Sequence, residues 1–286
     1  MLKANIETFL ACEGPYEEAG IVLYGAPFDS TTSYRPGTRF GSRAIRSESY
    51  GLESYSPYQD RDLEDFCVFD SGDLELCFGS AKKALEDLEE RAEVILEDGK
   101  IPFLLGGEHL VTLAAVRAAV RKYPDLAILH FDAHTDLRDE YLGVKLSHAC
   151  VLRRCWELLG DGRIFQFGIR SGERAEWIWG KDHVETHPFT VEFEVLSDVL
   201  RRLEGRPVYL TVDLDVMDPS VFPGTGTPEP GGISFDMLRQ AVTRICSEAN
   251  VVGCDVNELA PMLDASGAST AVACKIVREM LLALQK

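Results

Sequence analysis

The chain has 286 residues, of which 45% are hydrophobic and 27% charged, and this balance suits a globular protein with a sizeable buried core. Its formal net charge of −18 argues against nucleic acid as a partner, because nucleic-acid binding needs a basic surface. The same charge would attract a cationic small molecule, although the solubility of the protein is the simpler explanation.

Strand-like and helix-like segments alternate along the whole chain. Apolar runs predict strands within residues 21–24, 67–70, 101–105, 126–136, 163–168, 209–216 and 251–255. Helical periodicity predicts helices within residues 41–52, 81–97, 110–122, 148–159, 191–203, 235–246 and 270–284. No linker, low-complexity tract or internal repeat divides this pattern. We therefore expect one α/β domain over residues 1–286, with three layers in which helices cover both faces of a mostly parallel sheet.

The strongest chemical signal follows the apolar run that begins at residue 126. Residues 129–136 read Leu-His-Phe-Asp-Ala-His-Thr-Asp, so Asp132, His134 and Asp136 alternate along the segment. In an extended backbone these three side chains project from the same face. Burying them unpaired would be costly, and a divalent cation would remove that cost. The alternative is a solvated strand end that holds no metal.

Two further segments repeat this design. Residues 209–216 form an apolar run that carries Asp213 and Asp215, and His109 follows another apolar run at a strand-to-helix turn. In parallel α/β folds ligands bind where the carboxyl ends of the strands meet. Four carboxylates gathered there would raise one another's pKa unless cations offset their charge. Two imidazoles with four carboxylates suit a pair of Mn²⁺ ions better than Zn²⁺ or Mg²⁺.

Together these motifs resemble those of the ureohydrolase family, which includes arginase and agmatinase. The matching segments are Gly-Gly-Glu-His at 106–109, Asp-Ala-His-Thr-Asp at 132–136, Asp-Leu-Asp-Val-Met-Asp-Pro at 213–219 and Gly-Thr-Gly-Thr-Pro at 224–228. They occur in family order between about residues 25 and 258, which implies an arginase-like fold for most of the chain. Glu108 is a departure, because many relatives carry Asp there, and it puts the surroundings of the neighbouring ligand in question.

The resemblance implies two Mn²⁺ ions in each subunit and a role for each motif residue. One ion would be bound by His109, Asp132, Asp136 and Asp213, and the other by Asp132, His134, Asp213 and Asp215. Asp132 and Asp213 would then bridge the pair, which would activate a shared water molecule for attack on a guanidinium carbon. Asp136 would also pass a proton to the leaving amine.

Two residues outside these motifs complete the expected site. Glu258 follows a predicted strand, and its family position binds the substrate guanidinium; otherwise it would be a solvated charge. His148 begins a predicted helix, where a lone histidine is commonly structural. The resemblance implies that His148 contacts the substrate and exchanges protons with solvent, as a histidine pKa near neutrality would allow.

Residues 147–154 and 167–177 are more similar to agmatinase than to arginase, so agmatine is the expected substrate and urea and putrescine the products, a step of polyamine biosynthesis. Arginase, guanidinobutyrase or formiminoglutamase activity in the same fold remains open, as does a metal-binding regulatory protein. A dinucleotide-binding oxidoreductase would need a Gly-x-Gly-x-x-Gly motif after an early strand. Glu173 or Glu176 could attract the distal ammonium of agmatine, or either could be a solvated helix residue. Relatives form trimers and hexamers, so a homo-oligomer is expected.

Several segments carry weaker expectations. Residues 28–41 form either a rim loop near the substrate or a packed turn or subunit contact, and the glycines of residues 223–232 permit sharp turns rather than forming a phosphate site. His130 is expected in the core or behind a ligand. His183 and His187 lie in no motif.

The remaining composition bears on location. No apolar run approaches the ~20 residues of a membrane-spanning helix, and the first residues lack the apolar core of a signal peptide. Eight cysteines occur without a Cys-x-x-Cys pair, which argues against thiolate zinc sites and favours buried thiols. We expect a cytoplasmic protein with no membrane association.

Overall fold

Strands and helices alternate through most of the computed structural model, which describes residue 2 and residues 5–285. The strands are β1 (Ile21–Gly25), β2 (Tyr55–Ser56), β3 (Arg61–Asp62), β4 (Val68–Asp73), β5 (Ile101–Leu105), β6 (Ala127–Phe131), β7 (Ile164–Ile169), β8 (Glu185–Pro188), β9 (Pro207–Asp213) and β10 (Asn250–Asn257). The α-helices are α1 (Gly41–Ser49), α2 (Ala81–Glu97), α3 (Thr112–Lys122), α4 (Val151–Leu159), α5 (Arg174–His183), α6 (Phe193–Arg202), α7 (Phe235–Glu248) and α8 (Ala268–Leu284).

Eight of the strands form one sheet in the order β4-β1-β5-β10-β9-β6-β7-β8. Every neighbouring pair in this sheet is parallel, as the strand-helix alternation predicts. The remaining two strands, β2 and β3, pair only with each other and are antiparallel. This order makes β5, β10, β9 and β6 neighbours at the centre of the sheet, so the segments that follow them meet at one edge.

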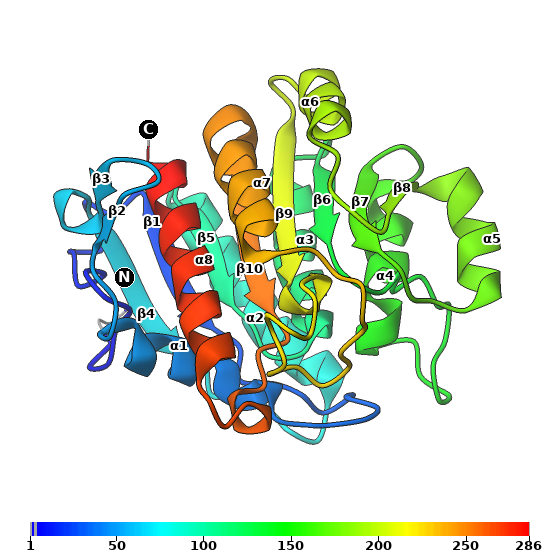
Figure 1. Cartoon of the computed structure of the whole chain (residues 1–286), viewed down its shortest axis with the longest axis horizontal. Coiled ribbons are helices and arrows are strands. Elements are labelled where there is room, and N and C mark those ends of the chain that lie inside the picture. Colours follow the sequence, from blue (N-terminus) through cyan, green and yellow to red (C-terminus); the bar gives the residue numbers. More distant parts are fainter. Residues whose placement is uncertain (1, 3–4, 286) are drawn as a thin grey trace.

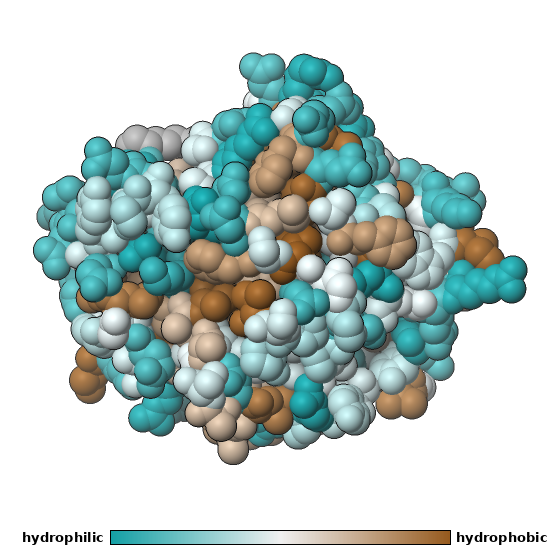
Figure 2. All heavy atoms as spheres, viewed as in Figure 1, coloured by the Kyte–Doolittle hydropathy of each residue, from teal (hydrophilic) through white to brown (hydrophobic). Residues whose placement is uncertain are grey.

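Helices cover both faces of the sheet, giving the three layers expected from the sequence (Figure 1). Helices α1, α6, α7 and α8 pack with one face of the sheet, and their apolar residues form one buried cluster. Helices α2, α3 and α4 pack on the opposite face and form the second cluster. Apolar side chains gather near the middle of the surface viewed in Figure 2, and hydrophilic side chains surround them.

Helix α2 shows how the sequence pattern produces this packing. The apolar stripe predicted for this segment is buried, and it comprises Ala84, Leu85, Leu88, Ala92, Ile95 and Leu96. These residues recur every three or four positions and therefore lie on one side of the helix, which packs against α3. The Ser80 side chain accepts a hydrogen bond from the Lys83 N–H at 3.2 Å and caps the first turn.

The structure departs from the sequence expectations in two respects. Helix α5 and the strands β2, β3 and β8 were not predicted, because they are short and mostly half-exposed and carry little periodic apolar signal. In addition, β6 ends at Phe131 and β9 at Asp213, so the expected extended strands stop earlier. Asp136 has a φ of 51° and Asp215 lies in the 3₁₀ turn Leu214–Val216. Strict strand alternation therefore does not bring the motif side chains together.

No helix in the part of the chain that the structure describes is long and apolar enough to cross a membrane.

A buried ion network ties α1 to the edge of the sheet. The Arg46 side chain is 2% exposed, and its Nε and Nη2 donate to the two carboxylate oxygens of Asp70 at 2.8 and 3.0 Å. Nη1 also contacts Asp73. Asp70 accepts further hydrogen bonds from the N–H groups of Phe9 and Gly72, both at 2.9 Å. The network therefore joins the N-terminal segment, α1 and β4.

Replacing Arg46 with Met should lower the free energy of unfolding by about 3–5 kcal/mol, because the Asp70 charge would stay buried without its partner. The matched control is Arg43→Met on the same helix, where the Arg43 side chain is 78% exposed and lies 3.6 Å from Glu7. That change should shift stability by no more than about 0.5 kcal/mol. Urea unfolding of both variants measures the difference, and equal losses would contradict the assigned role of Arg46.

Candidate active site

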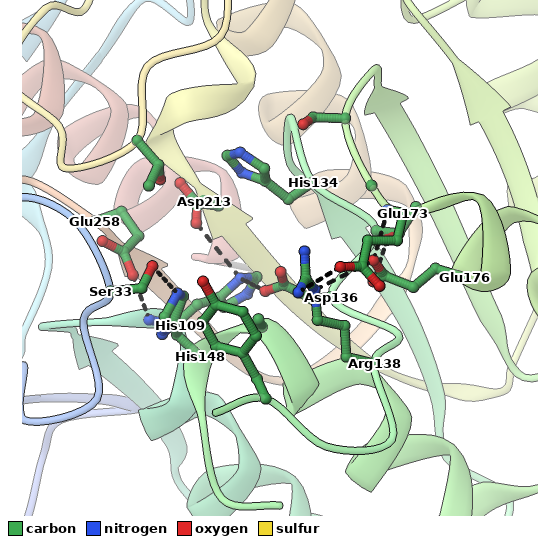
Figure 3. A pocket seen from close by; sticks show the side chains of 16 residues that line it. Ser33, His109, His134, Asp136, Arg138, His148, Glu173, Glu176, Asp213 and Glu258 are labelled. Carbon is green, nitrogen blue, oxygen red and sulfur yellow. Dashed lines mark hydrogen bonds and ion pairs between the residues drawn. The ribbon is translucent and has the colours of Figure 1, made fainter. Parts of the chain in front are cut away.

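A cavity lies where the carboxyl ends of the four central strands meet. It encloses about 350 Å³ and is lined by His109, His134, Asp136, His148, Asp213 and Glu258 among others. His109 follows β5, Glu258 follows β10, Asp213 ends β9, and the segment after β6 supplies His134 and Asp136. The structure thus brings the residues expected from separate motifs to one place (Figure 3).

A first cluster surrounds Nδ1 of His109. This nitrogen lies 3.0 Å from Asp132 Oδ2, 3.1 Å from Asp136 Oδ2 and 3.4 Å from Asp213 Oδ2. It is buried, and none of the described groups makes a hydrogen bond of good geometry with it. A nitrogen lone pair that faces three carboxylate oxygens is the arrangement that a divalent cation needs.

A second cluster surrounds Nδ1 of His134. Asp215 Oδ2 lies 3.1 Å from this nitrogen and Asp132 Oδ1 lies 3.4 Å from it. Asp132 therefore presents one oxygen to each cluster, which is the geometry of a bridging carboxylate. Asp213 differs, because its Oδ2 lies 3.4 Å from His109 Nδ1 but, among the described contacts, neither of its oxygens pairs with His134. Bridging by Asp132 and bridging by Asp213 both stay predictions.

His109 is oriented from behind by a hydrogen-bonded chain. Its Nε2 lies 2.9 Å from Thr211 Oγ1, which donates to Asp255 Oδ1 at 2.6 Å. Because the Thr211 hydrogen goes to Asp255, Thr211 accepts from Nε2–H, and Nδ1 is left as the nitrogen that faces the carboxylates and can offer its lone pair to a cation. Gly106 and Gly107 let the turn before His109 pack closely against neighbouring segments. A Cβ on Gly106 would lie 1.8 Å from Asn257 Oδ1, and one on Gly107 would lie 2.0 Å from Phe28 O.

His130 supports a ligand from behind, as expected from its depth in β6. Its Nε2 lies 2.9 Å from Asp132 Oδ2, and its Nδ1 lies 3.0 Å from Gln166 Nε2. The Gln166 amide also donates to Thr135 O, and its carbonyl accepts from Thr186 Oγ1 at 2.9 Å. Nδ1 is therefore an acceptor and Nε2–H donates to Asp132, so His130 holds Asp132 rather than offering a lone pair to a cation.

The buried carboxylates need compensating positive charge. Burial, followed by repulsion from Asp132, raises the pKa of Asp136 to about 7. Burial, followed by repulsion from Asp215, raises the pKa of Asp213 well above its ordinary value. Both shifts mean that the ionised forms are destabilised in the folded protein without a cation.

The neighbouring carboxylates favour the protonated forms of His109 and His134. Burial opposes protonation of His109, but the carboxylates of Asp132 and Asp136 raise its pKa well above the usual value. Burial likewise opposes protonation of His134, and Asp215 and then Asp132 raise its pKa. Both clusters thus favour added positive charge, which protons supply in the metal-free protein and divalent cations would supply in their place. The donor set, the lone pair of His109 and this charge imbalance fit a pair of divalent cations.

Glu258 occupies the wall beside the first cluster. Its Oε1 accepts the His109 N–H at 2.7 Å, and its backbone φ of 65° turns the chain directly after β10. Burial, together with the Glu108 charge, raises the pKa of Glu258 well above its ordinary value. Glu258 therefore presents its carboxyl group to the cavity, and no cationic side chain among the described residues forms an ion pair with it. Its role in binding a guanidinium stays a prediction.

His148 lies at the start of the 3₁₀ turn His148–Cys150 and lines the same cavity. The Tyr141 ring packs edge-on against it, with 5.9 Å between ring centroids. Burial lowers the pKa of His148 to about 4, below the near-neutral value expected from the sequence. The ring is therefore neutral at pH 7.

Three charged residues, Arg138, Glu173 and Glu176, lie at the mouth of the cavity, and the sequence did not distinguish their roles. Glu176 is buried and accepts from Thr135 Oγ1, Leu137 N and Glu173 N, so it is a structural residue. The Glu173 side chain is 59% exposed and lies 2.9 Å from Arg138 Nη1. Arg138 was missed, although a cation two residues after the Asp132–Asp136 motif was an available signal.

The remaining segments of interest fall into two groups. His183 pairs with Asp161 and His187 with Glu185, and neither lines the cavity. Ser33 and Thr227 do line it, so the loops at residues 28–41 and 223–232 both reach the rim. Arg35 holds them together through hydrogen bonds to Thr225 O and Gly226 O at 2.8 and 3.1 Å.

Comparison with known proteins relates this site to a family. Residues 19–283 match the arginase family. The chain is 50% identical over 282 residues to an agmatinase from Bacillus subtilis, covering 98% of this chain and 97% of that protein. A crystal structure of a putative agmatinase from Clostridium difficile superposes with a TM-score of 0.91 at 47% identity, covering 94% of this chain and 98% of that one. A mitochondrial guanidino acid hydrolase from Homo sapiens is 35% identical, covering 92% of this chain and 77% of that protein.

The lowered pKa of His148 should be measurable in the metal-free protein. As the pH falls from about 6.5 to 4, the unfolded chain takes up a proton at His148 that the folded chain does not, so this residue lowers stability. His148→Gln should therefore become more stable relative to the parent as the pH falls from 7 to 4.5. Urea unfolding with chelator present measures that difference, and a constant difference across the window would contradict the shift.

Proposed function

This chain belongs to the arginase family and is a hydrolase of guanidino compounds, and we propose that it cleaves agmatine to urea and putrescine. The observation that supports the chemistry most directly is the position of Asp132, whose two oxygens face two different histidines. A single carboxylate shared by two clusters suits a pair of cations held close together.

The cofactor that we propose is two Mn²⁺ ions in each subunit. Four carboxylates with two imidazoles suit Mn²⁺, whereas Mg²⁺ prefers oxygen alone and structural zinc sites are rich in thiolates. The proposed ligands are His109, Asp132, His134, Asp136, Asp213 and Asp215. When bound, such a pair would lower the pKa of a water molecule and so supply the nucleophile that the weakly electrophilic guanidinium requires.

The chain's own residues would orient the substrate and move its protons. Glu258 would pair with the guanidinium nitrogens through charge-assisted hydrogen bonds, which fixes the carbon in the cavity. Asp136 would deliver a proton to the leaving amine. His148, neutral at pH 7, would take up a proton within the cavity and return it to solvent, because it is partly exposed.

The charges at the mouth favour a substrate with a second cationic end. Arg138 lies 2.9 Å from Glu173 and 3.4 Å from Glu176, so its single positive charge faces two carboxylates. The three groups together carry a net charge of about −1 at neutral pH, which attracts an ammonium and disfavours a carboxylate. Agmatine has a guanidinium at one end and an ammonium at the other, whereas arginine adds a carboxylate beside its ammonium.

Arg138 also supports a second candidate, a guanidino acid such as 4-guanidinobutyrate. If Glu173 turned away from the cavity, the Arg138 guanidinium would become available to a substrate carboxylate. Arginase and formiminoglutamase activities remain alternatives within the same fold. We further propose that the enzyme works in the cytoplasm as a trimer or hexamer and supplies putrescine for polyamine synthesis.

Metal analysis tests the proposed centre. Asp132→Ala and Asp213→Ala should each lose bound manganese and lower turnover by more than about a thousandfold, because several kcal/mol of transition-state stabilisation disappear. His148→Ala should keep both ions and slow the reaction by about a hundredfold or more. His187→Ala, which removes a histidine outside the cavity, serves as the control and should change neither quantity. A parental manganese content in either Asp variant would refute the ligand assignment.

A substrate panel tests the proposed activity. With manganese added, urea release should be most efficient from agmatine, compared with arginine and 4-guanidinobutyrate. Glu173→Gln should raise the KM for agmatine about fivefold with little change in kcat, because a partly exposed ion pair contributes about 1 kcal/mol of uniform binding. Glu140→Gln removes the same charge from an exposed position outside the cavity and should leave KM unchanged. Preferential hydrolysis of either other substrate would overturn the assignment of agmatine.

A further inference from the structure

His148 is framed by hydroxyl groups from the loop that follows β1. Its main-chain N–H donates to Thr31 Oγ1 at 3.0 Å, and the same oxygen lies 3.4 Å from its ring Nδ1. On the other side of the ring, Ser33 Oγ lies 3.4 Å from Nε2 (Figure 3). A loop that the sequence left between two interpretations therefore contacts both nitrogens of a cavity histidine.

Glu108 anchors this loop. Its side chain is fully buried, and Thr31 donates to it twice, from its N–H to Oε2 at 2.8 Å and from Oγ1 to Oε1 at 2.5 Å. Thr32 Oγ1 also donates to Oε2 at 3.3 Å. Although Glu108 precedes His109 in sequence, its carboxylate is directed to the loop rather than to the two clusters. Glu108, which stands where many relatives have Asp, therefore contacts the loop of residues 28–41 rather than the two clusters.

The short contact to Glu108 determines what Thr31 can offer to His148. A hydroxyl group has one hydrogen, and Thr31 donates it to Glu108 Oε1 at 2.5 Å when Glu108 is a carboxylate. Burial raises the pKa of Glu108 to about 7, so the carboxylate is its main form at pH 7.5. Thr31 Oγ1 therefore faces His148 only as an acceptor, towards both the main-chain N–H and Nδ1. A deprotonated Nδ1 would place its lone pair opposite a lone pair of Thr31, whereas Nδ1–H gives a favourable contact.

Ser147 supplies a second hydroxyl group near Nδ1 of His148. Its Oγ also lies 3.4 Å from Nδ1, and a serine hydroxyl can either donate or accept. Only a protonated Nδ1 is compatible with both neighbours, because Ser147 can turn to accept while Thr31 cannot turn to donate. Thr31 therefore decides the tautomer.

We propose that Thr31, anchored by Glu108, is a positioning residue that holds the neutral His148 ring in its Nδ1–H tautomer. Nε2 is then the nitrogen with a free lone pair, beside Ser33 at the cavity, and it takes up the proton during turnover. The tautomer follows from the contacts alone, whereas its catalytic use rests on the proposed function. The loop of residues 28–41 thereby acquires a role in proton transfer in addition to forming the rim.

Nuclear magnetic resonance of the metal-free protein at pH 7.5 tests the tautomer without reference to activity. Long-range ¹H–¹⁵N correlations distinguish the two neutral histidine forms, and the signals that vanish in His148→Gln identify this ring. The parent and Thr31→Ser, which keeps the hydroxyl, should show the Nδ1–H form. Thr31→Val, which has the same shape without the hydroxyl, should show a mixture or the Nε2–H form. An Nε2–H ring in the parent, or an unchanged tautomer in Thr31→Val, would overturn the proposal.

Kinetics of the manganese-loaded enzyme test the catalytic consequence. Thr31→Val should lower kcat about tenfold with little change in KM or metal content, and Thr31→Ser should restore most of the loss. Thr32→Val is the matched control, because Thr32 contacts the same Glu108 carboxylate but, in the described structure, makes no hydrogen bond with His148. It should leave kcat near the parental value.

A double-mutant cycle shows whether Thr31 acts through His148. In a His148→Ala background, Thr31→Val should have no further effect on kcat, because the ring that it positions is gone. An undiminished loss in that background, or an equal loss in Thr32→Val, would reduce Thr31 to a structural residue. If the parent releases no urea from any guanidino substrate, the proposed function fails, while the tautomer measurement still decides the positioning role of Thr31.

Discussion

Buried negative charge is the constraint on which the rest of this site depends. Asp132, Asp136, Asp213, Asp215 and Glu258 lie at one edge of the sheet and are each less than one-tenth exposed. So many carboxylates cannot remain ionised together in a protein interior unless positive charge lies among them. The surrounding histidines provide part of it by protonation, and a pair of divalent cations would provide it more completely. The same requirement explains why a cationic substrate suits this cavity.

The sheet order meets this constraint by placing four strands side by side. Strands β5, β10, β9 and β6 are neighbours although they lie far apart in the sequence, and each delivers its charged residues just beyond its carboxyl end. The strands are largely apolar and helices cover both faces of the sheet (Figure 1), while the charged groups of the cavity gather where the strands end. In each of these segments the apolar side chains of the core lie along the strand, and the charged side chains of the cavity lie at its carboxyl end.

Histidine orientation in this cavity is set from behind. Thr211 and Asp255 fix His109, Gln166 fixes His130 against Asp132, and Thr31 with Glu108 faces His148. In each case a hydrogen bond at one ring nitrogen determines what the other nitrogen can do. The supporting groups come from strands or from loops anchored to them, so the rigidity of the sheet is transmitted to the imidazole rings. Such preorganisation is what proton transfer and cation binding both require.

The sequence by itself determined which residues would meet, because apolar runs ending in Asp and His identify strand ends, and the ends of parallel strands share one edge. It also determined the layered fold and the buried stripe of α2. Only the tertiary structure decided that Asp132 faces two clusters, that Glu108 is directed to the loop of residues 28–41 rather than to the cavity, and that Glu173 is accessible at the mouth while Glu176 is buried. These outcomes depend on side-chain directions after the strands have ended, where the regular alternation of a strand no longer applies. They depend equally on loops brought together by distant segments, and local sequence does not encode that proximity.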